Sequence, residues 1–122
     1  MGGWKVMGEY LDVLEVDDIK DGEMKEVNAA GHGILIAKVG GNYYAVSNRC
    51  PHMGAKLVEG TLDGMIVTCP RHGSQFELRD GSVVRWTKWS GLAASVGKLI
   101  RSPRQIATYK VKIEGNRVLV EV

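Results

Sequence analysis

Short runs in which apolar and polar residues alternate make up much of this chain, and helical periodicity is hard to find. The clearest alternation lies near the C-terminal end, where residues 109–114 and 118–122 flank the turn pair Gly115-Asn116. We expect these two runs to pair as an antiparallel hairpin with one face in the core, because residues two apart on a strand share a face.

Other strand-like runs are equally short, and glycine, asparagine or aspartate separates them. They span residues 24–28, 34–39, 43–47, 61–62, 65–68, 74–78 and 82–86. Turns are expected at 30–33, 40–42 and 80–81, and Asp63-Gly64 is a strong two-residue hairpin signal. The polar stretch 17–22 reads as a connection that can hold one helical turn begun by an aspartate cap. The pattern predicts an antiparallel all-β domain.

Length and charge narrow the function classes. A chain of 122 residues fits one domain spanning residues 1–122, and 44% apolar with 25% charged residues is ordinary for a globular protein. The net charge of +2 is too small to indicate nucleic acid or an anionic membrane as partner. No apolar run approaches the ~20 residues of a membrane helix, and the N-terminal residues lack the apolar segment of a secretory signal. We therefore expect a cytoplasmic protein.

Two cysteine motifs carry the candidate chemistry. They read Cys50-Pro51-His52 and Cys69-Pro70-Arg71-His72, with sixteen residues between His52 and Cys69. A secreted disulfide framework would hold more than two cysteines, and the chain has only three histidines, two of which fall in these motifs. The two prolines stiffen the turns, since proline fixes φ and removes an N–H. We expect Cys50, His52, Cys69 and His72 to share one metal centre.

Two thiolates and two imidazoles suit two kinds of centre. Zinc binds such a set tetrahedrally in structural sites, and a Rieske [2Fe–2S] cluster takes two cysteines on one iron and two histidines on the other. Zinc motifs usually pair like with like, whereas here each motif supplies one sulfur and one nitrogen, which favours the cluster. A zinc-stabilised binding module remains the alternative at this point.

The wider sequence resembles the Rieske ferredoxin family. The resemblance lies in residues 50–57, Gly60 and 69–76, in the upstream stretches 22–27 and 43–50, and in the closing stretches 109–111, 115–116 and 118–120. It implies a β-sandwich-like base of two sheets that carries a small β subdomain, about residues 48–78, with one [2Fe–2S] cluster at its tip. It also implies that Cys50 and Cys69 bind the buried iron, while His52 and His72 bind the outer iron through Nδ1 and leave their far edges near solvent.

Several positions depart from other members of that family. The bc-type members carry two further cysteines where this chain has Ala55 and Arg71, so no disulfide can tie the loops here. High-potential members place a serine and a tyrosine beside the sulfurs, and this chain keeps Ser74 but has Phe76 in place of the tyrosine. With one donor to sulfur missing, we predict a reduction potential in the lower half of the Rieske range of about −150 to +300 mV. The alternative for Ser74 is a hydroxyl that caps a backbone group.

A segment near residues 88–102 has no counterpart in simple Rieske ferredoxins. It is either a docking surface or lid, or padding of the base sheets. Trp86 and Trp89 are expected to pack in the core or the subdomain, with contact to a partner as the alternative. Two other polar residues receive minor roles. Arg71 is expected on an exposed loop, where it is solvated, pairs with an acidic partner or favours the reduced state. His32, between two glycines, is expected to be a turn residue and not a ligand.

The resemblance implies an electron carrier and not an enzyme. In agreement with this expectation, the sequence shows no catalytic triad, phosphate loop or dinucleotide fingerprint. It would shuttle single electrons from a reductase to an oxygenase or another acceptor, as a monomer or weak oligomer. A non-catalytic small subunit of a reductase complex, such as nitrite reductase, is the alternative.

Overall fold

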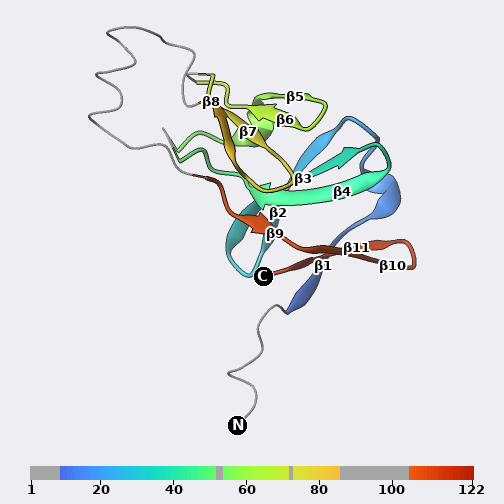
Figure 1. Cartoon of the computed structure of the whole chain (residues 1–122). Coiled ribbons are helices and arrows are strands. Elements are labelled where there is room, and N and C mark those ends of the chain that lie inside the picture. Colours follow the sequence, from blue (N-terminus) through green and yellow to red (C-terminus); the bar gives the residue numbers. More distant parts are fainter. Residues whose placement is uncertain (1–8, 52–53, 72, 86–104) are drawn as a thin grey trace, which may run out of the picture.

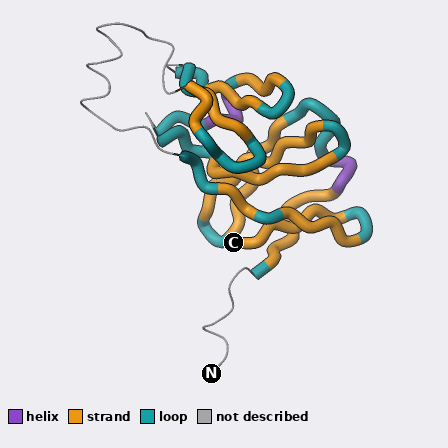
Figure 2. Tube along the Cα trace, in the orientation of Figure 1, coloured by secondary structure: helices purple, strands orange, loops and turns teal. Residues whose placement is uncertain are grey.

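A computed structural model gives the fold of residues 9–51, 54–71, 73–85 and 105–122, and the description below is limited to them. Strands dominate this part of the chain (Figure 2). No helix among these residues is long and apolar enough to cross a membrane. Residues 86–104 lie outside the description, so the expectations for the 88–102 segment, Trp86 and Trp89 remain untested.

The strands form three antiparallel sheets (Figure 1). The first sheet has the order β1-β11-β10, the second β2-β3-β4-β9 and the third β5-β6-β7-β8. Their bounds are β1 (Tyr10–Glu15), β2 (Met24–Ala29), β3 (His32–Val39), β4 (Asn42–Ser47), β5 (Thr61–Asp63), β6 (Ile66–Thr68), β7 (Gln75–Glu77), β8 (Val83–Arg85), β9 (Thr108–Tyr109), β10 (Val111–Glu114) and β11 (Arg117–Glu121). Two single 3-10 turns are η2 (Val16–Asp18) and η3 (Leu57–Glu59). The predicted all-β class, with a two-sheet base and a small third sheet, is confirmed.

Strand β3 lies between the two halves of the hydrophobic core. Its residues Ile34 and Ile36 belong to a buried cluster with β1 and β11, whereas Leu35 and Ala37 belong to a second cluster with the third sheet. All four side chains are fully buried. A strand covered on both faces needs apolar residues at every position, which explains why 34–37 lacks the alternation seen elsewhere.

Two turns differ from the predicted ones by one or two residues. The first hairpin turns at Ala30 and Gly31, with φ of 52° and 83°, so His32 already pairs with Ala29 as the first residue of β3. A two-residue hairpin needs such positive φ angles, which removes His32 from the turn. The hairpin near residue 64 pairs Asp63 with Ile66, so its turn is residues 64–65 and not 63–64.

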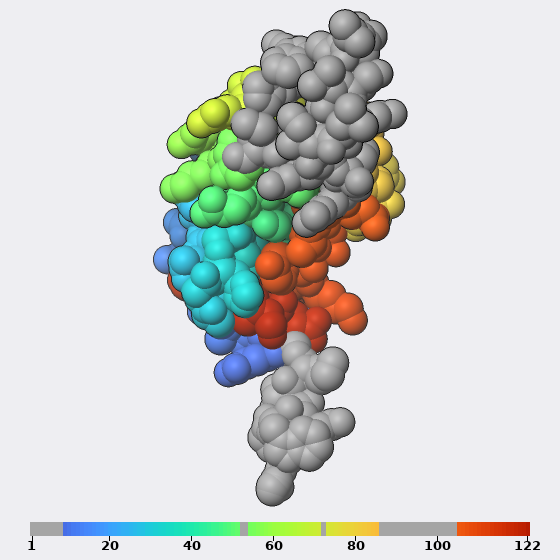
Figure 3. Space-filling model, turned by 90° about the vertical axis from the view of Figure 1, so that its left-hand side faces the viewer, coloured from blue at the N-terminus to red at the C-terminus, as the bar shows by residue number. Residues whose placement is uncertain are grey.

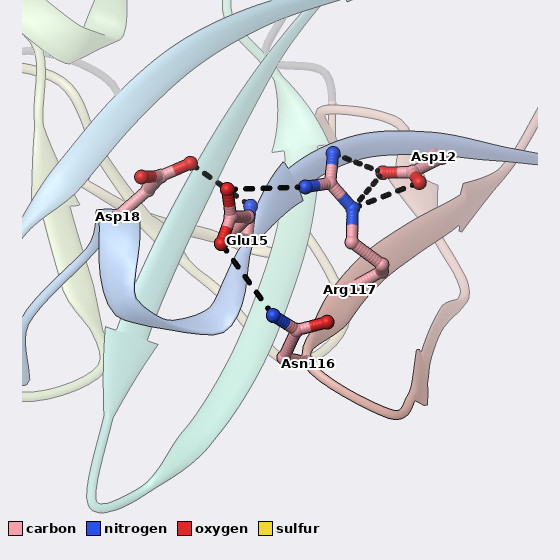
Figure 4. Close-up of polar contacts among 5 residues, drawn as sticks. All are labelled: Asp12, Glu15, Asp18, Asn116 and Arg117. Atoms are coloured by element: carbon pink, nitrogen blue, oxygen red, sulfur yellow. Dashed lines mark hydrogen bonds and ion pairs between the residues drawn. The ribbon is translucent and has the colours of Figure 1, made fainter.

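The first strand was not predicted from the sequence. Strand β1 pairs with β11, and Arg117 fastens the two by bonds of 2.9 Å to Asp12 and an ion pair of 3.4 Å to Glu15 (Figure 4). The hydrogen bond to Asp12 raises the pKa of Arg117 above its usual value. The helical turn expected within 17–22 is η2, which begins one residue earlier, at Val16. Its N-cap residue is Glu15 and not an aspartate, and the Glu15 N–H donates to Asp18 Oδ2 at 2.9 Å.

The C-terminal hairpin of β10 and β11 forms as predicted, with its turn at residues 115–116. Its inward face is carried mainly by β11, where Val118 and Val120 are fully buried. The prediction that both strands share a core-facing side is wrong for Ile113, which is 44% exposed, because β10 is the edge strand of its sheet.

Close backbone contact joins the segment after the first cysteine motif to the residue before the second. Gly60 ends η3, and a Cβ added at this position would overlap the carbonyl oxygen of Thr68, the last residue of β6. Only glycine allows the chain after the first motif to run this close to the residue before Cys69.

We predict that Gly60→Ala destabilises the fold by ~1–3 kcal/mol, because the two segments must separate to admit the methyl group. Urea unfolding of the purified chain measures the change. Gly33→Ala is the control, since its added Cβ would meet only Glu26 Oε2 at 3.8 Å, and its effect should stay below ~1 kcal/mol. Equal stability of the Gly60→Ala variant and the native chain would contradict the close contact.

Candidate metal centre

The first cysteine loop begins at Cys50, three residues after the end of β4, and closes on itself through the backbone. The N–H of Cys50 donates to the carbonyl of Ala55 at 2.8 Å, and the N–H of Gly54 donates back to the carbonyl of Cys50 at 2.6 Å. Gly54 has a φ of +74°, which L side chains rarely adopt. The Cys50 side chain is 1% exposed, so its sulfur lies inside the protein.

The second cysteine loop starts directly after β6 and closes in the same manner. The N–H of Cys69 donates to the carbonyl of Ser74 at 2.7 Å, and Gly73 has a φ of +77°. Cys69 is 2% exposed, and Ser74 is completely buried. Arg71 is exposed, as expected. Each loop therefore begins at a buried cysteine and contains a candidate histidine ligand.

Both cysteines belong to one buried cluster, together with Phe76 and Leu57. They are not joined by a disulfide. Two buried thiols in one apolar cluster match the sulfur half of a shared metal centre, since an apolar shell around such a centre controls the access of solvent. This donor set fits the centre predicted from the sequence.

His52 and His72 lie outside the described residues, and so does Met53. The described part of the chain therefore holds only two of the four candidate ligands. No group of three or more His, Cys, Asp or Glu that could bind a metal is found within it. The ligand set of Cys50, His52, Cys69 and His72 therefore remains a proposal.

His32, the third histidine, belongs to neither cysteine loop. It is exposed at the start of β3, with its ring 6.3 Å from the ring of Tyr109. It lines a cavity of about 270 Å³ beside Asn48 and Arg49, where the β2–β3 turn, the first loop and β9 meet. Figure 3 shows the cyan, green and orange segments that meet on this side of the molecule.

Asn48 supports the first loop, and the sequence analysis missed it. Its carbonyl accepts the N–H of Leu57 and its Oδ1 accepts the N–H of Val58, both at 2.8 Å. The residue is 3% exposed, and its Nδ2 has no hydrogen-bond partner among the described residues. Asn48 thereby holds η3 against the start of the loop. Its position two residues before Cys50 was the only available signal.

Two arginines hold the loops from outside, and neither was singled out from the sequence. Arg49 Nη1 donates to the carbonyl of Gly54 at 3.3 Å, and Arg85 Nε donates to the carbonyl of Gly73 at 3.0 Å. Gly73 directly follows the histidine of its loop, and Gly54 lies two residues after His52. The carbonyls are thus fixed by charged donors, which form stronger hydrogen bonds than neutral ones.

Comparison with known proteins identifies the family. Residues 9–110 match the Rieske [2Fe-2S] domain. The chain belongs to this family. It is 33% identical to the ferredoxin component of the alkene monooxygenase system of Xanthobacter autotrophicus, over 92% of this chain and 80% of that protein. It is 30% identical to the ferredoxin component of the naphthalene 1,2-dioxygenase system of Pseudomonas aeruginosa, over 93% and 96%.

Solved structures of Rieske proteins have the same fold. The ferredoxin of Sphingomonas yanoikuyae B1 superposes with a TM-score of 0.74 at 27% identity, covering 93% of this chain and 99% of that one. A chain from a complex of reduced oxygenase and oxidized ferredoxin in carbazole 1,9a-dioxygenase gives a TM-score of 0.73 at 28% identity, covering 92% of both chains. This Rieske chain is therefore an electron carrier with a [2Fe–2S] cluster and not an enzyme, and the zinc alternative is set aside.

We predict that Asn48→Ala destabilises this Rieske chain by ~1–3 kcal/mol, because the N–H of Val58 loses its acceptor in a partly buried position. Denaturant unfolding of the holoprotein measures the change, and loss of visible absorbance reports the centre itself. Asn28→Ala is the control, since Asn28 also accepts a backbone N–H but is exposed. A control variant as unstable as Asn48→Ala would show that burial of this bond is unimportant.

Proposed function

We propose that Cys50, His52, Cys69 and His72 hold one [2Fe–2S] cluster, through which the chain passes single electrons from a reductase to an oxygenase. The observation that carries this proposal is the pair of closed loops, each beginning at a buried cysteine of the same core cluster. The relatives described as ferredoxin components of oxygenase systems support the choice of acceptor. They favour a shuttle over a small subunit of a nitrite reductase.

The chemistry follows from the division of the ligands. When bound, the cluster accepts and releases one electron. Cys50 and Cys69 would hold the iron that faces the core, and His52 and His72 the iron that faces outward. The backbone bonds that close the two loops fix both cysteines before the metal arrives, and a rigid, water-excluding environment needs little rearrangement when charge changes.

We further propose that residues 1–122 form one Rieske domain, with a cluster-binding subdomain at about 48–78 and an atypical insert at about 88–102. The third sheet, which follows the first loop and brackets the second, supports this division. A cytoplasmic location, where a reductase and an oxygenase are both accessible, is part of the same proposal.

The direct test is metal analysis and spectroscopy of the chain purified or reconstituted without oxygen. We expect a red-brown protein with about two irons and two acid-labile sulfides per chain. The EPR spectrum after reduction with dithionite should show the lowered average g of a cluster with nitrogen ligands. A colourless protein that binds one zinc, or one without iron after reconstitution, would overturn the proposal.

The ligand assignment has its own prediction. His52→Ala or His72→Cys should abolish or alter the visible and EPR spectra, because an imidazole is removed from the outer iron. His32→Ala is the matched control and should leave both spectra unchanged, since His32 is the first residue of β3 and belongs to neither cysteine loop. Bleaching by His32→Ala would show that the ligands are misassigned.

Ser74 is proposed to tune the reduction potential. If its buried hydroxyl donates to a sulfur, Ser74→Ala should lower the potential by roughly 20–65 mV, the equivalent of one hydrogen bond of ~0.5–1.5 kcal/mol. Spectroelectrochemical titration measures the shift. An unchanged potential with an intact cluster would assign the hydroxyl to capping the backbone instead.

A further inference from the structure

The two cysteine loops carry positive charges and no negative ones. Residues 48–56 and 69–75 contain Arg49, Lys56 and Arg71 but neither aspartate nor glutamate. All three cationic side chains are exposed. Arg85 adds a fourth charge, because its guanidinium is bound to the carbonyl of Gly73 in the second loop. We call Arg49, Lys56, Arg71 and Arg85 the loop cations.

These charges are mostly uncompensated. Among the described residues, no carboxylate forms an ion pair with Arg49, Arg71 or Arg85. Lys56 lies 3.4 Å from Glu26, but both side chains are well exposed, so solvent screens this pair. Arg49 and Arg85 are held by backbone carbonyls, which fixes their charges at the surface of the loops.

The negative charges gather elsewhere. Residues 9–23 hold seven of the fourteen acidic side chains of the protein and only one lysine. They lie along β1, η2 and the segment before β2, and in Figure 1 η2 is on the opposite side of the molecule from the loops after β4 and β6. Figure 4 shows three of these carboxylates, of which Asp12 and Glu15 are only partly balanced by Arg117.

The loop cations exceed what the cluster itself requires. In an oxidised cluster with two thiolate and two neutral imidazole ligands, two ferric ions cancel the charges of two sulfides and two thiolates, and reduction adds a single negative charge. Four cations around such a centre therefore leave a positive field at the surface in both redox states. A field of one sign attracts partners of the opposite sign and orients them before contact.

We propose that the loop cations form a docking face for an acidic surface on the redox partner protein, with the acidic β1–η2 end turned away from that partner. This inference rests on the proposed function, because it assumes that electrons leave through these loops. Since the net charge of the chain is only +2, the asymmetry and not the total charge sets the orientation.

Small oxidants of opposite charge test the field without a known partner. The chain, loaded with its cluster and reduced by dithionite, is mixed by stopped flow with ferricyanide or with tris(1,10-phenanthroline)cobalt(III). Each oxidant takes one electron from one reduced chain, giving ferrocyanide or the cobalt(II) complex. We expect the rate with ferricyanide to fall several-fold between ~10 mM and ~0.5 M salt, and the rate with the cobalt complex to rise.

Matched variants separate the local field from the net charge. Lys56→Gln and Lys112→Gln each remove one exposed lysine that pairs with a glutamate, the first in a cysteine loop and the second on β10 of the base. At low salt, Lys56→Gln and Arg71→Gln should slow ferricyanide about two- to five-fold, and Lys112→Gln less than about 1.5-fold. The reduction potential of each variant is measured so that a change in driving force is not mistaken for a change in encounter.

The outcomes distinguish the two proposals. A chain without a cluster would fail the proposed function before this experiment begins. With an intact cluster, equal slowing by Lys56→Gln and Lys112→Gln, or a ferricyanide rate that does not depend on salt, would overturn the docking face and leave the proposed function standing. A cobalt complex that reacts faster than ferricyanide at low salt, after correction for driving force, would also overturn the docking face and leave the proposed function standing.

Discussion

The hydrogen bond from each cysteine N–H to a carbonyl five residues later is the constraint on which the candidate centre depends. The N–H of Cys50 donates to Ala55 and the N–H of Cys69 donates to Ser74, so a backbone hydrogen bond closes each loop. Because the two cysteines also share one apolar cluster, the closed loops face each other across buried side chains. The arrangement of the sulfur ligands is therefore a property of the folded chain, and it involves no disulfide between the loops.

Several side-chain hydrogen bonds, and no disulfide, support these loops. The chain has only two cysteines, Cys50 and Cys69, and they form no disulfide. Arg49 and Arg85 instead bind the carbonyls of the two left-handed glycines, and Asn48 binds two N–H groups of η3. The same arginines bring positive charge to the surface. Structural support and partner recognition are thus assigned to the same side chains, so neither role can change without affecting the other.

The sequence predicted the all-β class, most strands and the two motifs, because strand periodicity and ligand spacing are local signals. It did not predict β1, whose pairing with β11 depends on residues more than a hundred positions apart, such as Asp12 and Arg117. It misplaced His32, since the turn depends on the φ angles of Ala30 and Gly31 and not on the composition of 30–33. The supporting roles of Asn48 and Arg85 were also missed, because each is defined by a partner in another segment.

Strand β3 has a consequence for how the molecule unfolds. Its consecutive residues Leu35 and Ile36 enter two different core clusters, one under the cysteine loops and one under the first sheet. Opening either half exposes one side of this strand and loosens its register against β2 and β4. The two halves should therefore unfold in a single cooperative transition, and the backbone amides of β3 should exchange with solvent deuterium only through global opening. A carrier built in this manner keeps its loops in place for as long as the whole chain remains folded.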